Sequence, residues 1–388
     1  MKILRGTPVT ALVLLILAGA VSFLAAREFL SMRVPDVVVP ASGYEMHLLS
    51  EWEPSLKGTP ADTPVYIQAG SEPGGTVLVM GGTHPNEPSS SLTAVLFLER
   101  ARVNRGRLVV IPFANIMGFS HNDPQEASPQ RLHFTLADGS VRTFKYGSRA
   151  TNPIHAWPAP DVYIHPQSGQ ELSGKEKSNL NRAHPGTLDG DLTSRLAYGL
   201  RQLIVKEKID LAFDLHEASP EYPVVNAMVA HERSMELAAM VAMELEGAGI
   251  PMRLEPSPKN LRGLTHREWG DFTETMPILL ETANPSQGRL RGRTDEELVL
   301  TGKDKCYTKA AALGRLFVPY DGSQSIELRV ARHTVTVKTF LDMLGLFDEA
   351  KEVDVEGIPT YEELLGQGYG AFLTPLPLKD ASPGSQQG

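Results

Sequence analysis

The fold of this chain is decided by the stretch VLVMGGTHPNE, residues 77–87. Its first four residues form an apolar run typical of a buried strand, and the Gly81-Gly82 pair ends that run. His84 and Glu87 follow in a His-x-x-Glu pattern. A buried strand that ends in a turn brings an imidazole and a carboxylate to the edge of a sheet, where one divalent metal ion can bind both. The pattern favours a zinc hydrolase as the first hypothesis.

A third ligand is expected at His216, which follows a second strand-like apolar run at 211–215. Asp214 lies on the same face of that strand by the period of two. Two histidines, one glutamate and a water in the fourth position are typical of open catalytic zinc sites. The single cysteine, Cys306, excludes a cysteine-rich structural site. A His-x-x-Glu pattern also arises by chance in a chain with 11 histidines, but its place after a glycine pair argues against chance here.

With these segments the chain resembles the zinc carboxypeptidase superfamily and, within it, the succinylglutamate desuccinylase and aspartoacylase branch. Five matching segments occur in the family's order between residues 46 and 300: GGTHPNE (81–87), PFANIMGF (112–119), NRAHPG (181–186), DLH (214–216) and LLE (279–281). The resemblance implies one zinc ion per chain, which would lower the pKa of its bound water to about 7.

The resemblance also implies a general base. Glu281 ends the apolar run 276–280 and is expected to take the proton of the attacking water and later return it to the leaving amine. Glu217 is the alternative base. Adjacent residues of a strand point to opposite faces, so we expect Glu217 to turn away from a metal bound by His216.

Substrate contacts follow from the same resemblance. Asn181 and Arg182 match the pair that binds the substrate's free carboxylate, which a planar guanidinium can hold through two parallel hydrogen bonds. The arginine that stabilises the oxyanion is expected within the long stretch 120–178. Arg149 is the first choice there, and Arg131 is the alternative.

One position departs from the family pattern. Asn181 and Arg182 are called the clamp pair below. In the family, an aspartate usually stands two residues before the asparagine of this pair and orients a zinc-bound histidine, whereas this chain has Asn179 there. A neutral amide is a weaker acceptor than a carboxylate, so metal affinity or the pKa of bound water is expected to differ.

Apolar strand candidates alternate with helical stretches and predict an α/β fold, with a mixed, mostly parallel sheet covered by helices on both faces and the site at the strands' carboxyl ends. The expected strands are 77–80, 108–113, 211–215, 224–230 and 277–280, and the expected helices are 90–102, 192–207 and 232–248. Residues 46–320 are expected to form the catalytic domain. Residues 321–388 are expected to form a small C-terminal extension, with a disordered tail at 381–388.

The N-terminus predicts an anchor in the cell membrane. Lys2 and Arg5 precede an uncharged run at 8–26, which is long enough to cross a bilayer. Basic residues before the run favour a cytoplasmic n-region at 1–7 and a catalytic domain on the extracytoplasmic side, joined by a linker at 27–45. An uncleaved anchor is favoured over a removed signal, because 24–26 is a poor cleavage site.

These observations predict a membrane-anchored, zinc-dependent hydrolase that cleaves an amide bond near a free carboxylate, such as an N-acyl amino acid deacylase. Two alternatives stay open: an exported metallocarboxypeptidase or amidase acting on peptides or cell-wall peptides, and a catalytically silent module that binds carboxylates. The net charge of −9 argues against nucleic acid as a partner. The oligomeric state has no signal in the sequence.

Overall fold

The computed structural model describes residues 8–123, 128–250 and 252–377. The chain divides into two compact units, residues 1–35 and 36–388. The first unit contains the helix α1, Pro8–Ser31, which carries no charged residue before Arg27 and Glu28. The expected n-region at 1–7 and the expected disordered tail at 381–388 lie outside the described residues.

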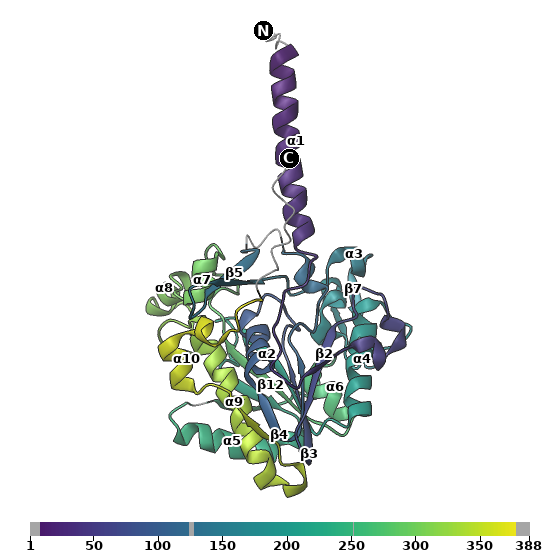
Figure 1. Ribbon diagram of the computed structural model, residues 1–388, viewed down its shortest axis with the longest axis vertical. Helices are drawn as coiled ribbons and strands as arrows, with labels where there is room; N and C mark the ends of the chain where they lie inside the picture. The colour runs from purple at the N-terminus through teal and green to yellow at the C-terminus, as the bar shows by residue number, and fades with distance from the viewer. Residues whose placement is uncertain (1–7, 124–127, 251, 378–388) are drawn as a thin grey trace. The chain divides into compact units, whose positions relative to one another are not determined.

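The second unit is built on one mixed sheet, which confirms the expected α/β fold class (Figure 1). Strands β4, β3, β9 and β12 lie side by side and parallel in its centre, and antiparallel β2 and β10 flank them. The strands are β1 Glu45–Leu48, β2 Pro64–Ala69, β3 Glu72–Met80, β4 Arg102–Ile111, β9 Leu211–Ala218, β10 Ala227–Ala230, β11 Arg253–Pro256, β12 Met276–Ala283 and β13 Asp354–Glu356. All five strands expected from the sequence are present.

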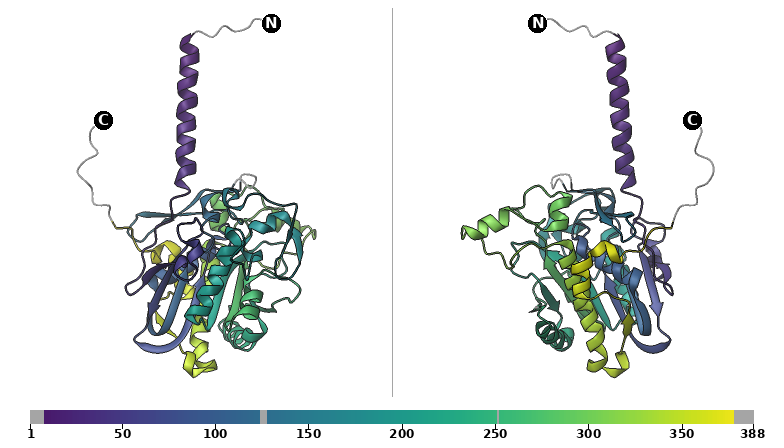
Figure 2. Two further views of the ribbon diagram at one scale, coloured as in Figure 1. Left: turned by 90° about the vertical axis from the view of Figure 1, so that its right-hand side faces the viewer. Right: turned by 60° about the vertical axis from the view of Figure 1, so that its left-hand side comes forward.

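Helices cover both faces of this sheet, as the two further views also show (Figure 2). One face packs against α2 Pro88–Arg100, α5 Met235–Gly247 and α9 Ile326–Phe347, and the other against α4 Leu192–Glu207 and α6 Thr265–Phe272. Along β3, Val77 and Val79 enter the first core, while Leu78 and Met80 enter the second. A strand buried on both faces reads as a continuous apolar run, which is why 77–80 shows no alternation.

The long stretch at 120–178 forms two hairpins rather than part of the main sheet. They consist of β5 Arg131–Thr135 with β6 Val141–Lys145, and β7 Val162–Ile164 with β8 Glu171–Ser173, and the short helix α3 Pro153–Ala156 lies between them. Arg149, the arginine expected to stabilise the oxyanion, follows β6 of the first hairpin by four residues.

The segment after residue 320 packs into the same unit, so the expected boundary at 320/321 does not separate two compact units, nor does the one at 45/46. Helix α9 places Val337, Phe340 and Leu344 in the core beneath the sheet, and the Phe340 ring centroid lies 5.2 Å from that of Phe213 in β9. This apolar face is buried against the sheet and against the neighbouring helices α2 and α5. The helices α7 Glu296–Thr301, α8 Cys306–Ala312 and α10 Tyr361–Gln367 complete the second unit.

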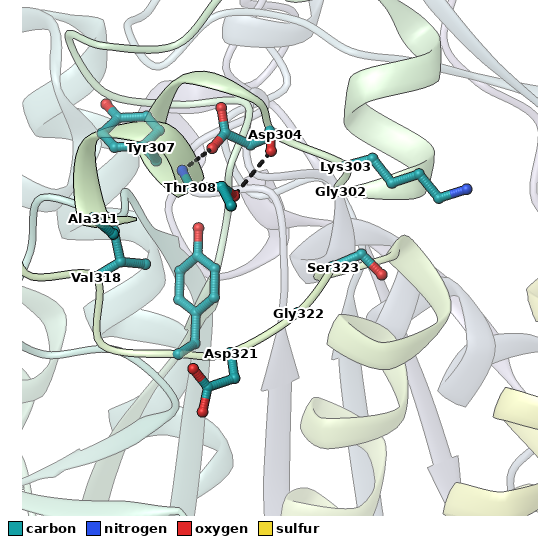
Figure 3. A pocket seen from close by; sticks show the side chains of 11 residues that line it. Gly302, Lys303, Asp304, Tyr307, Thr308, Ala311, Val318, Asp321, Gly322 and Ser323 are labelled. Carbon is teal, nitrogen blue, oxygen red and sulfur yellow. Dashed lines mark hydrogen bonds between the residues drawn. The ribbon is translucent and has the colours of Figure 1, made fainter. Parts of the chain in front are cut away.

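A pocket of about 390 Å³ lies beside α8, lined by residues 302–323 (Figure 3). Asp304, one of its two carboxylates, accepts hydrogen bonds from the backbone N–H groups of Cys306 at 2.9 Å and Thr308 at 3.0 Å in the first turn of α8. Within the described part of the chain, the only group of three or more residues placed to share a metal ion lies elsewhere.

The role of α9 predicts a stability difference between two residues of the same helix. Phe340 is fully buried, so Phe340→Ala should lower the free energy of unfolding by about 3 to 5 kcal/mol. Leu346 is 75% exposed, so Leu346→Ala should change it by less than about 0.5 kcal/mol. Urea unfolding followed by circular dichroism of residues 36–388 measures both. Equal, small losses would show that α9 is not part of the core.

Candidate metal centre

The turn after β3 needs both of its glycines. Gly82 has a φ of +72°, a backbone conformation that glycine adopts without strain. A Cβ on Gly81 would lie 2.3 Å from the carbonyl oxygen of Ser90, so only glycine allows α2 to approach so closely. The turn carries His84 to the carboxyl end of β3 and leaves Glu87 at the start of α2.

Strand register brings the other two groups to the same edge. In the parallel ladder between β9 and β12, His216 lies opposite Glu281. Asp214 lies two residues earlier on β9, opposite Met80 at the end of β3. Because side chains alternate along a strand, Asp214 and His216 share the face covered by α6. Residues that are more than 100 positions apart in the sequence therefore meet at one point.

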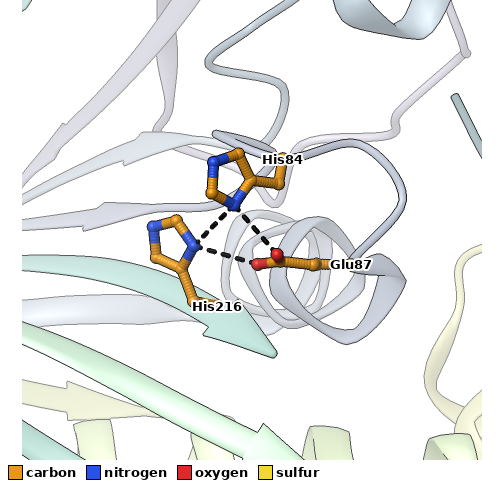
Figure 4. A group of neighbouring side chains, drawn as sticks. All are labelled: His84, Glu87 and His216. Atoms are coloured by element: carbon orange, nitrogen blue, oxygen red, sulfur yellow. Dashed lines mark hydrogen bonds and ion pairs between the residues drawn. The ribbon is translucent and has the colours of Figure 1, made fainter. Parts of the chain in front are cut away.

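Three side chains converge closely enough to share one ion (Figure 4). The Nδ1 atoms of His84 and His216 lie 3.1 Å apart, and each lies 2.9 Å from an oxygen of Glu87. All three residues are buried. Ligand atoms held at about 2.0–2.1 Å from a tetrahedral zinc ion lie about 3.3 Å apart. The three groups thus fit zinc after a shift of a few tenths of an ångström.

The outward nitrogens of both rings are held by acceptors, which leaves the Nδ1 atoms to face the shared position. His216 Nε2 lies 2.8 Å from Asp214 Oδ2, and the hydroxyls of Thr83 and Thr265 donate to that carboxylate at 2.7 Å each. His84 Nε2 lies 2.8 Å from the amide oxygen of Asn179. Such acceptors fix the tautomer and orientation of a metal-binding histidine.

The two rings carry different charges in the metal-free chain. Burial lowers the pKa of His216, but the carboxylates of Asp214 and Glu87 outweigh burial and raise it to about 10. Burial, followed by the charge of Arg149, lowers the pKa of His84 to about 4. At neutral pH His216 is therefore a cation that donates to both carboxylates, whereas His84 is neutral.

Glu281 enters the pocket as an uncoordinated carboxylate. Its Oε2 has no hydrogen-bond partner among residues 8–123, 128–250 and 252–377, and burial raises its pKa to about 8. A nearby divalent cation would favour the ionised form and lower this pKa. Glu217 borders the same pocket, but its carboxylate is paired at 2.6 Å with Arg329 of α9 and at 2.7 Å with Asn284. Glu217 is thus held away from the metal position, as expected.

The two arginine candidates lie in different places. Arg149 Nη1 lies 2.9 Å from Glu87 Oε1 and 3.1 Å from His84 Nδ1, and its side chain lines the pocket. Arg131 lies 4.0 Å from the carboxylate of Asp36 and is not among the residues that line the pocket. The geometry therefore favours Arg149 as the group near the reacting atoms.

Asn181 and Arg182, the pair expected to bind the substrate carboxylate, line the same pocket. Asn181 Oδ1 accepts from the backbone N–H of Thr265 at 3.0 Å, which turns the amide nitrogen of Asn181 the other way. Arg182 is mostly buried, and its backbone passes so close to Gly263 that a Cβ there would lie 2.4 Å from the Arg182 oxygen. Gly263 has a φ of +85°, so any other residue at this position would strain the backbone.

All the site residues expected from the sequence line one pocket of about 550 Å³. They are His84, Glu87, Arg149, Asn181, Arg182, His216 and Glu281, and their individual roles stay predictions. Other lining residues had no local signal in the sequence, among them Tyr222, Glu255 and Gln287. Only the pairing of β10 with β11 and the course of two loops bring these residues to the pocket.

Comparison with solved structures finds partial likenesses to both groups that the motifs resemble. A succinylglutamate desuccinylase/aspartoacylase from Rhodobacter sphaeroides is 18% identical, with 66% of this chain and 63% of that chain covered and a TM-score of 0.37. A metallo-carboxypeptidase from Burkholderia cenocepacia is 11% identical, with 83% and 69% covered and a TM-score of 0.46. The product-bound ectoine utilization protein EutE from Ruegeria pomeroyi is 18% identical, with a TM-score of 0.36.

The match to EutE covers 59% of this chain and 55% of that chain, so little more than half of that protein's length is spanned. No family model matches the sequence, and no curated protein matches it.

Metal binding is expected to release the proton of His216 and, below the raised pKa of Glu281, part of a second proton from that carboxyl. His216 is protonated below a pKa of about 10, and its Nδ1 can bind a metal only after losing that proton. The apparent affinity for Zn²⁺ should therefore rise by about tenfold or more per pH unit between pH 6 and pH 8. Competition with a chelator, corrected for the chelator's own titration, measures this slope. An affinity that does not change with pH would contradict the charge assigned to His216.

Proposed function

We propose that this protein is a zinc-dependent hydrolase that cleaves an amide bond close to a free carboxylate. One observation carries the proposal: a single pocket contains an open set of three metal ligands, a carboxylate without a partner and an arginine beside an asparagine amide. A purely structural zinc site would be closed by a fourth protein ligand. No fourth ligand joins the three among the residues that the structure describes.

The residues divide the reaction between them. His84, Glu87 and His216 would hold the zinc ion, which when bound would supply an acidic water and a Lewis acid for the substrate carbonyl. Glu281 takes the proton of the attacking water and passes it to the departing amine nitrogen, so that water and amide become a carboxylic acid and an amine. Arg149 donates a hydrogen bond to the carbonyl oxygen as negative charge develops on it.

The substrate is positioned by its carboxylate. Arg182 holds that carboxylate through its guanidinium, and the amide nitrogen of Asn181 completes the contact. An N-acyl amino acid meets this requirement. The C-terminal residue of a peptide meets it as well, and the apolar side chains of Val229, Leu264 and Leu279 in the pocket give such a residue room for its own side chain. Cleavage of exported peptides is therefore the second candidate.

Substitution of the proposed base separates an enzyme from a silent binding module. Glu281→Gln should lower kcat by about 10²- to 10⁴-fold and leave the zinc content unchanged, because Glu281 is not a ligand. A panel of N-acyl amino acids and short peptides, assayed with the zinc-loaded protein, identifies the substrate class. Glu362→Gln on the exposed side of α10 is the matched control. Carboxylate binding without turnover by the unmodified protein would support the silent module.

The two arginine candidates can be tested directly against each other. Arg149→Ala should lower kcat by about 10²- to 10³-fold, as expected for the loss of an oxyanion donor. Arg131→Ala should leave kcat within a factor of about two, because Arg131 contacts Asp36 and not the pocket. Steady-state kinetics at saturating zinc measures both variants. A loss confined to Arg131→Ala would overturn the assignment.

We also propose that α1 anchors the protein in the cell membrane with the catalytic unit on the extracytoplasmic side. The helix has 24 residues and a mean hydropathy of 2.6 over its most apolar window, and Lys2 and Arg5 precede it in the sequence. The full chain should fractionate with membranes and be digested by protease added from outside. A soluble protein that lacks its first residues would instead indicate a cleaved signal.

A further inference from the structure

The amide of Asn179 contacts charged or polar groups at both of its ends. Its oxygen accepts from the ring nitrogen Nε2 of His84 at 2.8 Å and from the backbone N–H of Asn181 at 3.0 Å. Its nitrogen donates to Glu176 Oε2 at 2.7 Å. Asn179 is only 3% exposed, so the protein rather than solvent decides which way this amide points.

We propose that Glu176 is a positioning residue for the metal centre, acting on His84 through the amide of Asn179. This inference rests on the proposed zinc site. An ionised carboxylate only accepts hydrogen bonds, so Glu176 selects the rotamer in which the Asn179 nitrogen faces Glu176 and the oxygen faces His84. The flipped amide would set an N–H group against the N–H of His84 and leave two acceptors facing each other at Glu176.

The carboxylate also compensates for a missing charge. An asparagine oxygen is a weaker acceptor than a carboxylate, but a hydrogen bond to an anion at the other end of the amide polarises it. The negative charge in this chain is therefore on Glu176. The amide of Asn179 separates it from His84, whereas a carboxylate in place of that amide would contact His84 directly. Backbone contacts fix the spacing, since the N–H of Asn179 donates to the carbonyl of Glu176 at 3.1 Å.

The same carboxylate reaches the clamp. Glu176 Oε2 lies 3.9 Å from Nε of Arg182, and the backbone N–H of Arg182 donates to the carbonyl of Asn179 at 2.9 Å. One turn thus connects the residue in contact with His84 to the residue proposed to bind the substrate carboxylate. Loss of Glu176 should alter both zinc affinity and KM, whereas a purely structural role would alter neither in the folded protein.

An exchange of the two side chains tests this arrangement. Zinc affinity is measured on the full chain by competition with a chelator, which needs no turnover. Glu176→Ala should weaken zinc binding by about tenfold or more. The double variant Glu176→Gln with Asn179→Asp keeps one amide and one carboxylate in contact and should recover at least the unmodified affinity. The KM of the double variant should still differ from that of the unmodified protein, because the side chain at position 176 is then neutral beside Arg182.

Controls separate the possible outcomes. Glu171→Gln, an exposed position five residues earlier, should behave as the unmodified protein in both measurements. If Glu176→Ala does not fold, Glu176→Gln alone should show a smaller loss of affinity, and the double variant should reverse that loss. Unchanged zinc affinity in the folded Glu176 variants would overturn the inference and leave the proposed hydrolase intact. An unmodified protein that binds no zinc would overturn both.

Discussion

The in-register parallel pairing of β3, β9 and β12 is the constraint on which the site depends. Leu211 of β9 pairs with Val77 of β3 on one side and with Met276 of β12 on the other. This register sets where the three strands end, so that His84, His216 and Glu281 lie at the same edge of the sheet. A slip of one residue in β9 would turn His216 towards α9 and bring Glu217 to the metal position. Such a slip would move apolar side chains out of both hydrophobic cores and so cost free energy. The two cores therefore fix the register that brings the site residues together.

The site places several charges in a buried space, and the carboxylates of Asp214 and Glu87 have compensating partners there. Asp214 is held by two hydroxyls and the His216 ring, while Glu87 lies between two imidazoles and Arg149. Beneath them, the backbone N–H of Glu217 donates to Glu87 Oε2 at 3.0 Å, and the Glu217 side chain ties that strand to Arg329 of α9. Breaking such a buried pair leaves an uncompensated charge. Helix α9 therefore supports the proposed metal centre although it contributes none of the three expected ligands.

Local patterns in the sequence were sufficient for five strands of the main sheet and three of the helices, and they predicted that His84, Glu87 and His216 lie close together. An apolar run predicts a buried strand, and the Gly-Gly pair or His216 that follows it predicts where the strand ends. The alternation of side chains along a strand predicted that Asp214 lies on the same face as His216 and that Glu217 lies on the other. Long-range packing has no such signal. Nothing near α9 in the sequence indicates that it packs under β9, so residues after 320 were expected only as a small C-terminal extension. Glu176 was missed for a similar reason, because its partners are set by the turn at 174–182 rather than by a strand or helix period.

The central claim is that His84, Glu87 and His216 close around one zinc ion through the inner nitrogens of both rings. A crystal structure of the zinc-loaded protein, with anomalous diffraction recorded on both sides of the zinc absorption edge, tests this most directly. The account predicts one anomalous peak per chain, about 2.0–2.1 Å from Nδ1 of His84 and of His216 and from a carboxylate oxygen of Glu87, with Glu281 outside the coordination shell. A peak bound through Nε2 of either histidine, coordinated by Glu281, or absent from this pocket would contradict it.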